Sequence, residues 1–596
     1  MWVFNHTVKY YCKKFSIKII VSFLLPVMMI FIMLSKPKIK PILCIAIMLI
    51  GLSVLAQAQQ TDVDQAIREI NRPLSEEIKE KLKPSLLKPP EIFPPPQPKP
   101  DEGPRFSIKK IKLTGIESFS PDHFDAIKKS YEERDVSFAE LNNLTKEIAQ
   151  EYLRHGILAT CFIPQQKIQD GIFAIQVVEA RMGVLHINEH KYFKQNRINY
   201  YWKLRKEEIV KYPTILQSLS LINKNPDREA KAIFHKGTQP KTTDVTLDVK
   251  TNFPMHFSYG LDNEGVTSTG KNRMNLGVRH NNFIGLDDTL LSGYLFGKDF
   301  NGIYTYHSIP ITNFGTTLVY GHSYSKAAPK KEFEASGIHA MARDITVALH
   351  QDLFREGQPA GEVHLELDAK DNTTIENSGT TIRDRLRVIR LGFDLLSRKF
   401  NQATYLITEI SQGINGLGAR RLNSFSSREA ENVFTKLNVT FQFRHPLLFG
   451  LQGNTQIKGQ VASTRLTPEE GFYLGGISSV RGYPSGDFLA DDALQTNTEL
   501  LLPAFFIPDS LPMPFSKKSF KDNVTFITFL DYGWGNKRDH LTNEKDTANL
   551  MSTGAGLRIL ILDKAILRLE WGFPIGDATI TEGGNSRFHF SIDFEM

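Results

Sequence analysis

The C-terminal part of the chain, from about residue 253 to residue 596, alternates apolar and polar residues with a period of two. Residues 437–443 place Leu, Val, Phe and Phe at every second position, and residues 363–368, 567–573 and 588–596 follow the same rule. Successive side chains of a strand point to opposite faces, so each stretch predicts a β-strand with one apolar and one polar face. The C-terminal part of the chain is therefore predicted to be all-β.

Two kinds of β-domain fit this alternation, because a soluble sandwich and a transmembrane barrel both have one apolar face. Three features favour the barrel: a leader with the order of a signal peptide, aromatic residues at strand ends, and a chain that stops on a strand. Transmembrane strands need about 9 to 11 residues and a connection, so residues 253–596 accommodate about 16 of them. We predict a transmembrane barrel of about 16 antiparallel strands, with a soluble β-domain as the alternative.

The leader, residues 1–58, has the three regions of a secretory signal peptide. Three lysines between residues 36 and 40 precede an apolar run at 42–55, and Ala56-Gln57-Ala58 follows. This order predicts cleavage after Ala58. A second apolar run at 15–34 would form a membrane helix, unless translation starts at Met33, which is the interpretation we favour.

Composition excludes several classes of protein. With 41% hydrophobic and 23% charged residues, the chain is unlike a helical membrane transporter. The net charge of +7 comes from seven lysines in the leader, and the remaining 65 basic residues balance the 65 acidic ones. The basic pI therefore does not indicate a nucleic-acid partner. Only Cys161 remains after the predicted cleavage, so no intramolecular disulfide is expected.

Four segments are predicted between the leader and the barrel. Residues 59–83 place apolar side chains at helical spacing and predict an amphipathic helix. The proline-rich residues 84–104 predict an extended linker. Residues 105–182 and 183–252 mix strand and helix patterns and predict two small α+β modules, followed by the barrel at 253–596.

The elements of the two modules are predicted from local patterns. In the first module, Ser120-Pro121 predicts the start of one helix, and Ser137 with Glu140 predicts a capping box at the start of a second, which ends near Gly156. The predicted strands of this module are 106–113, 157–163 and 172–178. The second module is predicted to have a helix at 215–222 and strands at 184–187, 229–234 and 245–249.

Two motifs in the barrel region indicate a contact inside the lumen. Gly475-Gly476 precedes Val480-Arg481-Gly482-Tyr483, and Phe529, Asp531 and Gly533 share one face of a later strand. Lipid would penalise Asp531 on the outward face, so that face is predicted to line the lumen. Arg481, at a glycine-flanked loop tip, could then pair with Asp531. Gly475, Gly476, Gly482 and Gly486 would permit the tight path of such a loop. The alternative is that Arg481 is a solvated turn residue and Asp531 an ordinary lumen group.

The chain resembles a known family, the outer-membrane transporters of two-partner secretion, also called haemolysin or haemagglutinin secretion and activation proteins. In that family a proline-rich linker precedes two POTRA modules and a barrel. The first barrel hairpin carries Gly260, Asp262, Asn263 and Gly265 in the family's Gly-x-Asp-Asn-x-Gly pattern. Further matches are Asn281-Asn282, Gly285, Asp287-Asp288, Leu474-Gly475-Gly476, Val480-Arg481-Gly482-Tyr483, Glu499 and Asp531-Tyr532-Gly533.

The resemblance implies a transporter in the outer membrane of a Gram-negative bacterium, with the POTRA-like modules in the periplasm. One large, β-rich, TpsA-like secreted protein is the implied cargo, and it would dock unfolded on these modules and thread through the barrel. ATP is not expected to drive export, because folding of the cargo outside would remove the unfolded species. Outer-membrane lipid and the barrel-assembly machinery are further implied partners. No nucleic acid is expected.

The resemblance also implies roles for residues. A long loop carrying Arg481 folds into the barrel and faces Asp531, and the helix at 59–83 plugs the barrel at rest. The residues implied in this loop latch are Val480, Arg481, Gly482, Tyr483, Phe529, Asp531 and Gly533. Gly475, Gly476, Glu499, Gly260, Asp262, Asn263 and Gly265 support the motif.

Three other classes of protein are alternatives to a secretion transporter. An outer-membrane insertase of the same superfamily is the main alternative, although such relatives usually have more periplasmic modules. A passive porin would not need the modules. An enzyme is not indicated, because the chain has no G-x-S-x-G, no H-E-x-x-H and no paired cysteine ligands. No catalytic residue, metal or cofactor is predicted, and Glu366, Asp368 and Glu570 are interpreted as ordinary lumen carboxylates.

Overall fold

A computed structural model describes residues 105–596, apart from 121, 169, 189–190, 331–332, 356–357, 380, 400–401, 420–427, 429, 514–518, 540–544, 562–563 and 581–583. The predicted signal peptide, the helix at 59–83 and the linker at 84–104 lie outside the described residues. No helix in the described part of the chain is both long and apolar enough to cross a membrane.

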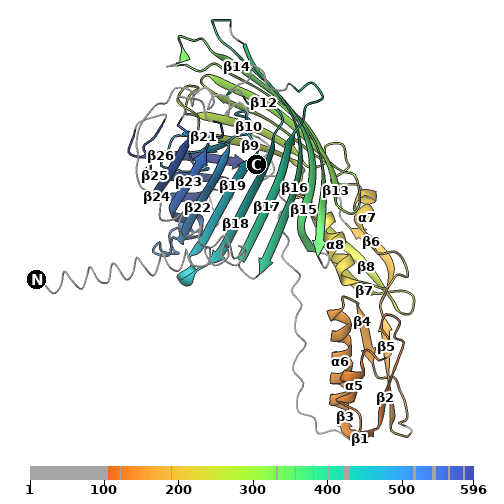
Figure 1. The fold of residues 1–596 in the computed structure, drawn as a ribbon. Helices are drawn as coiled ribbons and strands as arrows, with labels where there is room; N and C mark the ends of the chain where they lie inside the picture. Colours follow the sequence, from red (N-terminus) through yellow and green to blue (C-terminus); the bar gives the residue numbers. More distant parts are fainter. Residues whose placement is uncertain are drawn as a thin grey trace, which may run out of the picture. The chain divides into compact units, whose positions relative to one another are not determined.

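Sixteen antiparallel strands close into a barrel, which confirms the predicted fold class (Figure 1). Each strand pairs with its neighbour in the chain except where a short β20–β21 hairpin intervenes, and β26 returns to β9. The strands are β9 (Met255–Asp262), β10 (Arg273–His280), β11 (Thr289–Gly297), β12 (Phe300–Pro310), β13 (Thr316–Ala327), β14 (His339–Arg355), β15 (Gln358–Ile375), β16 (Thr381–Lys399), β17 (Gln402–Gly413), β18 (Thr435–Pro446), β19 (Gln452–Ala462), β22 (Asp492–Pro503), β23 (Val524–Asn536), β24 (Thr547–Ile561), β25 (Ala565–Pro574) and β26 (Arg587–Glu595).

The two faces of the barrel wall have the polarity of a membrane protein. On β15, Leu365 and Leu367 are 51% and 38% exposed, whereas Glu366 and Asp368 between and beside them are 5% and 4% exposed. A soluble sandwich would bury the leucines and expose the acids. The alternation therefore places an apolar surface outside and a polar lumen inside, as a lipid-embedded barrel requires.

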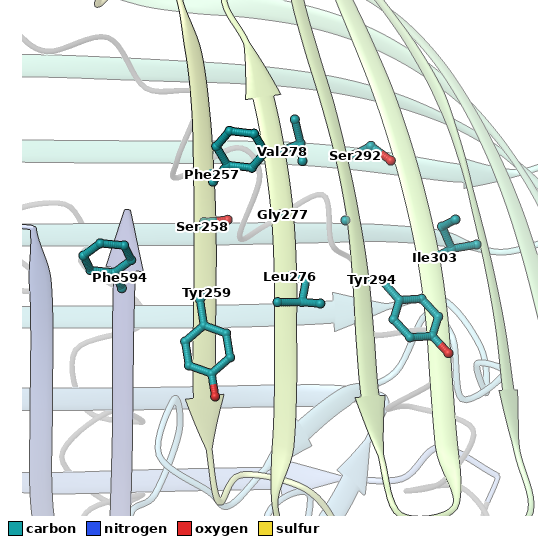
Figure 2. Close-up of a pocket in the computed structure, with 11 residues that line it drawn as sticks. Phe257, Ser258, Tyr259, Leu276, Gly277, Val278, Ser292, Tyr294, Ile303 and Phe594 are labelled. Carbon is teal, nitrogen blue, oxygen red and sulfur yellow. The ribbon is translucent and has the colours of Figure 1, made fainter. Parts of the chain in front are cut away.

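The barrel closes between its first and last strands. β26 pairs with β9 from Ser591 opposite Asp262 to Glu595 opposite Ser258. Figure 2 shows Phe594 of β26 beside Tyr259 of β9, with Leu276 of β10 nearby, in an apolar groove over these strands. The ring of backbone hydrogen bonds is therefore complete, which leaves no strand edge facing lipid.

The first α+β module is built from two sheets and a long helix. β2 (Lys110–Thr114), β5 (Ile172–Glu179) and β4 (Ala159–Phe162) form one sheet, and β1 (Arg105–Ile108) pairs with β3 (Arg134–Ser137). α5 (Asp125–Lys129) and α6 (Phe138–Arg154) complete the module. α6 begins with the predicted capping box, in which Ser137 Oγ accepts from Glu140 N at 3.2 Å and Ser137 N donates to Glu140 Oε2 at 2.7 Å.

Two local predictions for this module are wrong. The strand predicted at 106–113 is divided, because both Lys109 N and Lys110 N donate to Gly171 O and the chain changes partner from β3 to β5. The helix predicted to start at Ser120-Pro121 starts at Asp125 instead. Asp125 N donates to Asp122 O in a tight turn, and this turn precedes the helix.

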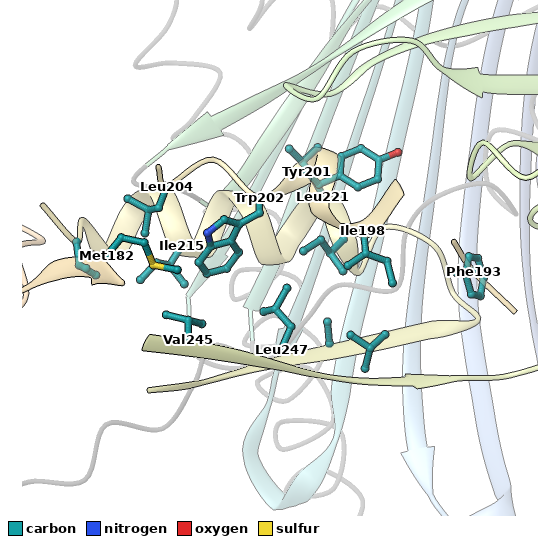
Figure 3. Close-up of a cluster of buried hydrophobic side chains, with 14 residues drawn as sticks. Met182, Phe193, Ile198, Tyr201, Trp202, Leu204, Ile215, Leu221, Val245 and Leu247 are labelled. Atoms are coloured by element: carbon teal, nitrogen blue, oxygen red, sulfur yellow. The ribbon is translucent and has the colours of Figure 1, made fainter. Parts of the chain in front are cut away.

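The second module packs two helices on one three-stranded sheet. The sheet order is β6 (Arg181–Asn188), β8 (Thr242–Thr251) and β7 (Arg228–Lys236), and the helices are α7 (Gln195–Tyr201) and α8 (Tyr212–Ile222). Figure 3 shows the core between them, in which Trp202, Ile215 and Leu221 face Val245 and Leu247. This apolar layer stabilises the module without a disulfide.

Charged and polar contacts join the second module to the barrel. Arg228 donates to both carboxylate oxygens of Asp287, at 2.9 and 3.0 Å, in a pair that is almost fully buried. Next to it, Asp227 accepts from Asn281 Nδ2 at 2.7 Å and lies 2.9 Å from His256 Nε2. Asn281 and Asp287 lie between β10 and β11, so this turn of the barrel binds the module.

Candidate functional site

Residues 463–491, between β19 and β22, form a segment that we call the lumen loop. It contains the short hairpin of β20 (Phe472–Leu474) and β21 (Phe488–Ala490). Nearly every residue from 466 to 491 is buried, although the loop belongs to neither module nor to the barrel wall. Because its contacts are with inward-facing strand residues, the loop lies inside the barrel.

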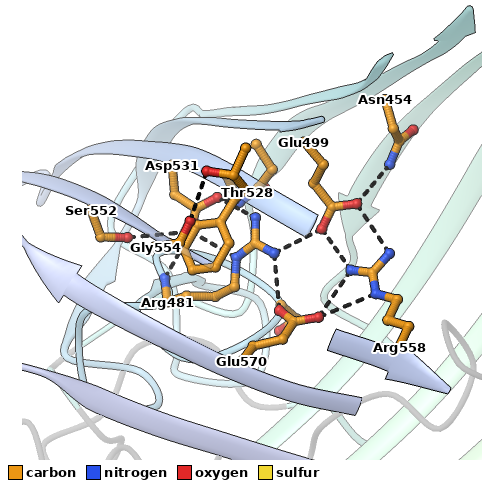
Figure 4. Close-up of polar contacts among 12 residues, drawn as sticks. Asn454, Arg481, Glu499, Thr528, Asp531, Ser552, Gly554, Arg558 and Glu570 are labelled. Atoms are coloured by element: carbon orange, nitrogen blue, oxygen red, sulfur yellow. Dashed lines mark hydrogen bonds and ion pairs between the residues drawn. The ribbon is translucent and has the colours of Figure 1, made fainter. Parts of the chain in front are cut away.

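Arg481, near the tip of the lumen loop, binds Asp531 of β23 (Figure 4). Asp531 accepts from Arg481 Nε at 2.9 Å, from Nη2 at 2.7 Å and from the backbone N–H at 3.1 Å. Both residues are almost completely buried. A two-pronged guanidinium–carboxylate pair of this kind fixes orientation as well as distance.

Two further carboxylates surround the same guanidinium. Arg481 Nη1 donates to Glu499 Oε1 of β22 at 2.7 Å and to Glu570 Oε2 of β25 at 3.0 Å. Arg558 of β24 also donates to both acids, at 2.7 and 3.0 Å. Three acids thus share two arginines, so removal of Arg481 would leave excess buried negative charge.

Other contacts hold the tip of the loop in the same place. Arg481 Cζ lies 3.5 Å from the ring centroid of Phe529, which is on the same inward face of β23 as Asp531. The carbonyl of Arg481 lies 2.8 Å from His589 Nε2 on β26. Together with the carboxylates, these residues bind the loop to β22, β23, β25 and β26.

The neighbours of Arg481 explain the rest of its motif. Val480 and Tyr483 are fully buried in a small apolar cluster with Leu474 and Phe488, and Tyr483 Oη donates to Asp577 O at 2.7 Å. A Cβ at Gly482 would meet Pro574 N at 2.6 Å and Ser552 Cβ at 2.7 Å, so no larger side chain fits.

Backbone conformation and close packing account for the remaining glycines of the motif. Gly475, Gly476 and Gly486 have positive φ values of 104°, 90° and 65°, which glycine adopts readily. A Cβ at Gly533 of β23 would lie 2.9 Å from side-chain atoms of Leu474 and Val480. The small residues of both motifs therefore permit the close approach of the loop to the wall.

The base of the lumen loop binds a second set of charges. Glu470 Oε1 accepts from Arg390 Nη2 of β16 at 2.6 Å and from Lys370 Nζ of β15 at 2.9 Å. Its other carboxylate oxygen lies 2.7 Å from Lys436 Nζ of β18. All four side chains are at least nine-tenths buried. One acid of the loop is therefore held by three bases of the wall.

These two anchors use different parts of the barrel wall. One lies on β15, β16 and β18 and the other on β22, β23 and β25, so their strands are two to eight pairings apart in the ring of sixteen. The loop presents a cation to an acidic wall and an anion to a basic wall. This arrangement consists of buried ion pairs and hydrogen bonds between the loop and the wall.

The residues of the first barrel hairpin lie close to the tip of the loop. Asn263 bonds the backbone of Phe588 and Phe590 on β26, at 2.9 Å each, while Asp262 accepts from Arg273 at 2.9 Å. Asn263 and Gly265 line one small pocket together with Gly476 and Tyr483 of the loop. A Cβ at Gly260 would meet Asp593 Oδ1 of β26 at 3.1 Å. The hairpin motif thus supports the strand closure beside the loop.

Sequence analysis missed several of these contacts. The sequence indicates Glu499 only as part of a motif and Glu570 only as an ordinary lumen acid. In the structure both bind Arg481. Glu470 and its three basic partners were not predicted. The acidic turn Pro468-Glu469-Glu470-Gly471, which ends three residues before Gly475-Gly476, is the local signal that could have indicated the second anchor.

Comparisons with known proteins agree on one family. Residues 241–559 match the family model for haemolysin secretion/activation proteins ShlB, FhaC and HecB. Residues 106–180 match the model for POTRA domains of the ShlB type.

Individual relatives span most of the chain. The outer membrane transporter CdiB of Dickeya dadantii is 21% identical over 471 residues, which cover 77% of this chain and 81% of that protein. The heme/hemopexin transporter protein HuxB of Haemophilus influenzae is 24% identical over 507 residues, covering 79% and 83%. The solved structure of CdiB from Escherichia coli has a TM-score of 0.68 at 18% identity, covering 91% of this chain and all of that one, and shows the same fold.

Proposed function

This chain belongs to the family of haemolysin secretion/activation proteins, the outer-membrane transporters of two-partner secretion, and we propose that it threads one unfolded partner protein through its barrel to the cell surface. Membership places the barrel in the outer membrane and the POTRA domains in the periplasm, and it implies a secreted TpsA-like partner. The identity of that partner is set by this chain's own periplasmic surfaces.

The observation that carries the proposal is that the lumen loop is bound to the barrel wall at two places, through Arg481 and through Glu470. A polypeptide cannot pass while residues 466–491 fill the bore, so export requires the loop to move or the cargo to pass beside it. Charged pairs suit such a device, because water entering with the cargo would hydrate both partners and weaken their attraction. Val480, Arg481, Gly482, Tyr483, Phe529, Asp531 and Gly533 are proposed to form this latch, with Glu499 and Glu570 as further carboxylate partners of Arg481.

The remaining steps of the proposal are those that the family resemblance implies. An unfolded cargo docks on a POTRA domain by adding a strand to a sheet edge or by laying an amphipathic stretch in a groove. The helix predicted at 59–83 leaves the barrel when cargo arrives. Folding of the cargo outside removes the unfolded species, which draws export without ATP. Barrel-assembly machinery inserts the protein into the outer-membrane lipid.

Deletion of the gene, followed by comparison of culture supernatants and outer-membrane fractions, tests the proposal. We expect one large, β-rich protein to disappear from the supernatant while other barrel proteins stay at normal levels. A broad loss of barrel proteins would instead indicate an insertase, and unchanged supernatants would reject secretion.

A further inference from the structure

Three side chains of the first module converge outside the lumen loop and its partners. His123 lies in the turn before α5, Glu151 lies in the last turn of α6, and His155 caps the end of that helix. Their ligand-type atoms all lie within 4.8 Å of one another. Two imidazoles and one carboxylate are the donor set of many zinc sites in proteins.

The measured separations fit one bound ion. Glu151 Oε1 lies 3.3 Å from His123 Nε2 and 3.5 Å from His155 Nδ1. Bonds of about 2.0–2.1 Å in a tetrahedron place ligand atoms about 3.3 Å apart. An ion would therefore bind the three groups with only small movements.

His123 carries an independent indication of a ligand. Its Nε2 is buried and makes no hydrogen bond with the described residues, although it is aimed at Glu151. A buried nitrogen without a partner is unfavourable, and a metal ion would satisfy it.

Neighbouring residues already orient the three groups. The ring of His123 stacks on Phe119 with a centroid separation of 4.3 Å, and Phe119 also contacts His155 edge to face at 5.1 Å. Arg154 donates to Glu151 Oε2 at 2.8 Å, which leaves Oε1 directed at both histidines. Supporting contacts of this kind are typical of metal ligands. His155 Nδ1 also lies 3.0 Å from Glu151 O, a contact that it would exchange for the ion.

The donor set selects the class of ion. Imidazole nitrogens suit Zn²⁺ and similar transition-metal ions, whereas Ca²⁺ and Mg²⁺ require more oxygen ligands than the site offers. His155 is half exposed, so ions and water have access from solvent. Three protein ligands leave the fourth position open to water or to a donor group from another molecule.

A second group of two histidines and one glutamate has a geometry that does not fit a bound ion. His350, Glu362 and His364 meet on β14 and β15. There His350 Nδ1 and Glu362 Oε1 are 2.5 Å apart, which is too close for both atoms to bind one ion and indicates a hydrogen bond instead. The barrel group therefore serves as an internal comparison.

We propose that His123, Glu151 and His155 form a site for one Zn²⁺ ion in the first POTRA domain. Binding joins the end of α6 to the segment before α5 and stabilises the folded domain by mass action. The site shares no residue with the lumen latch.

The test uses the full-length protein, purified in detergent with a histidine-free tag and stripped of metal with a chelator. Calorimetric titration with ZnCl₂ is expected to show binding that weakens about tenfold or more in His123→Ala, in His155→Ala and in the conservative Glu151→Gln. His186→Ala, at an exposed histidine of the second domain, and His350→Ala should leave this binding unchanged. Circular dichroism confirms that each variant is folded.

Two spectroscopic readouts make the test independent of a folding defect. Co²⁺ is expected to give the visible absorption of a tetrahedral site in the wild type and to lose it in Glu151→Gln. Zn²⁺ should slow amide hydrogen exchange at residues 119–124 and 151–155 in the wild type only. Equal Zn²⁺ affinity in the wild type and in all three site variants would overturn the proposal. So would binding that depends on His350, or binding only between protein molecules.

Discussion

Glu470 and Arg481 belong to the same lumen loop, yet their side chains bind oppositely charged parts of the barrel wall. Glu470 contacts Lys370, Arg390 and Lys436 on β15, β16 and β18, whereas Arg481 contacts carboxylates on β22, β23 and β25. Release of one anchor alone leaves the loop tethered by the other.

Arg481→Ala should reduce export about tenfold or more, because removing one partner of a buried ion pair costs about 3–5 kcal/mol and leaves three acids poorly compensated. The barrel should still insert, since every wall strand keeps its pairing. The ratio of secreted partner to folded barrel in the outer membrane measures this effect. Lys458→Ala removes another cation from the inward face of β19 and should export normally. Normal export by Arg481→Ala would contradict the latch.

Glu470→Gln should loosen the base of the loop while the tip stays bound. Lys370, Arg390 and Lys436 would then repel one another without their shared carboxylate. We expect a higher ion conductance in planar bilayers and faster hydrogen exchange at residues 466–472. The matched control is Glu334→Gln, at an exposed acid outside the lumen loop. Wild-type conductance in Glu470→Gln would show that the second anchor does not hold the loop.

Gly482→Ala should act as strongly as Arg481→Ala, although it removes no charge. The added methyl group would meet backbone atoms of Pro574 and Phe573 at 2.6 and 2.8 Å, and backbone cannot move aside cheaply. The tip of the loop should therefore lose its contacts with the barrel wall. Increased protease cleavage near residue 481 would reveal this change. Gly416→Ala is the control, because a Cβ there meets nothing within 4 Å. An unchanged digestion pattern in Gly482→Ala would argue against this packing.

Sequence reasoning found Arg481 and Asp531 because strand parity and a family motif pointed to the same pair. It did not find Glu470, whose partners Lys370 and Arg390 lie 100 and 80 residues away in the sequence. Periodicity assigns a residue to the polar face of a strand, but it does not state which acid meets which base across a lumen. Glu570 shows the same limit: its face was predictable, whereas its contact with Arg481 depends on how the loop folds.

Arg228→Ala should weaken the attachment of the second module to the barrel. The buried two-pronged pair with Asp287 would be lost at a cost of about 3–5 kcal/mol. Hydrogen exchange should rise in α8 and in residues 281–288, while heat-modifiable migration shows an intact barrel. Lys231→Ala, at an exposed position on the same strand, should have no effect. If hydrogen exchange is equal in Arg228→Ala and Lys231→Ala, the Arg228–Asp287 pair does not contribute to the attachment of the second module to the barrel.

Glu179 should make the stability of the first module depend on pH. Burial raises the pKa of its carboxyl group, but hydrogen bonds from Ser118, the backbone of Glu117 and Tyr152 outweigh this and hold the pKa below its usual value. A lowered pKa means that the stabilisation is complete above the usual glutamate pKa of about 4.3 and is lost as the pH falls through the lowered value.

Replacement tests this assignment directly. Glu179→Gln should lower the free energy of unfolding by about 1.5–3 kcal/mol at pH 7, the range for hydrogen bonds to a charged group. It should also reduce the loss of stability of this module at acidic pH. Thermal unfolding of the first module between pH 3 and pH 7 measures both effects. Asp135→Asn, at an exposed position on β3, is the control. If Glu179→Gln loses stability at acidic pH as the wild type does, another group is responsible for the pH dependence.

The pairing of β26 with β9 joins the last strand of the barrel to its first. β9 is synthesised before β26. The unclosed sheet therefore has two edge strands with unpaired backbone groups until β26 pairs with β9. Such edges adhere to any extended chain they encounter. The two edges therefore stay able to pair with other extended chains until the barrel closes.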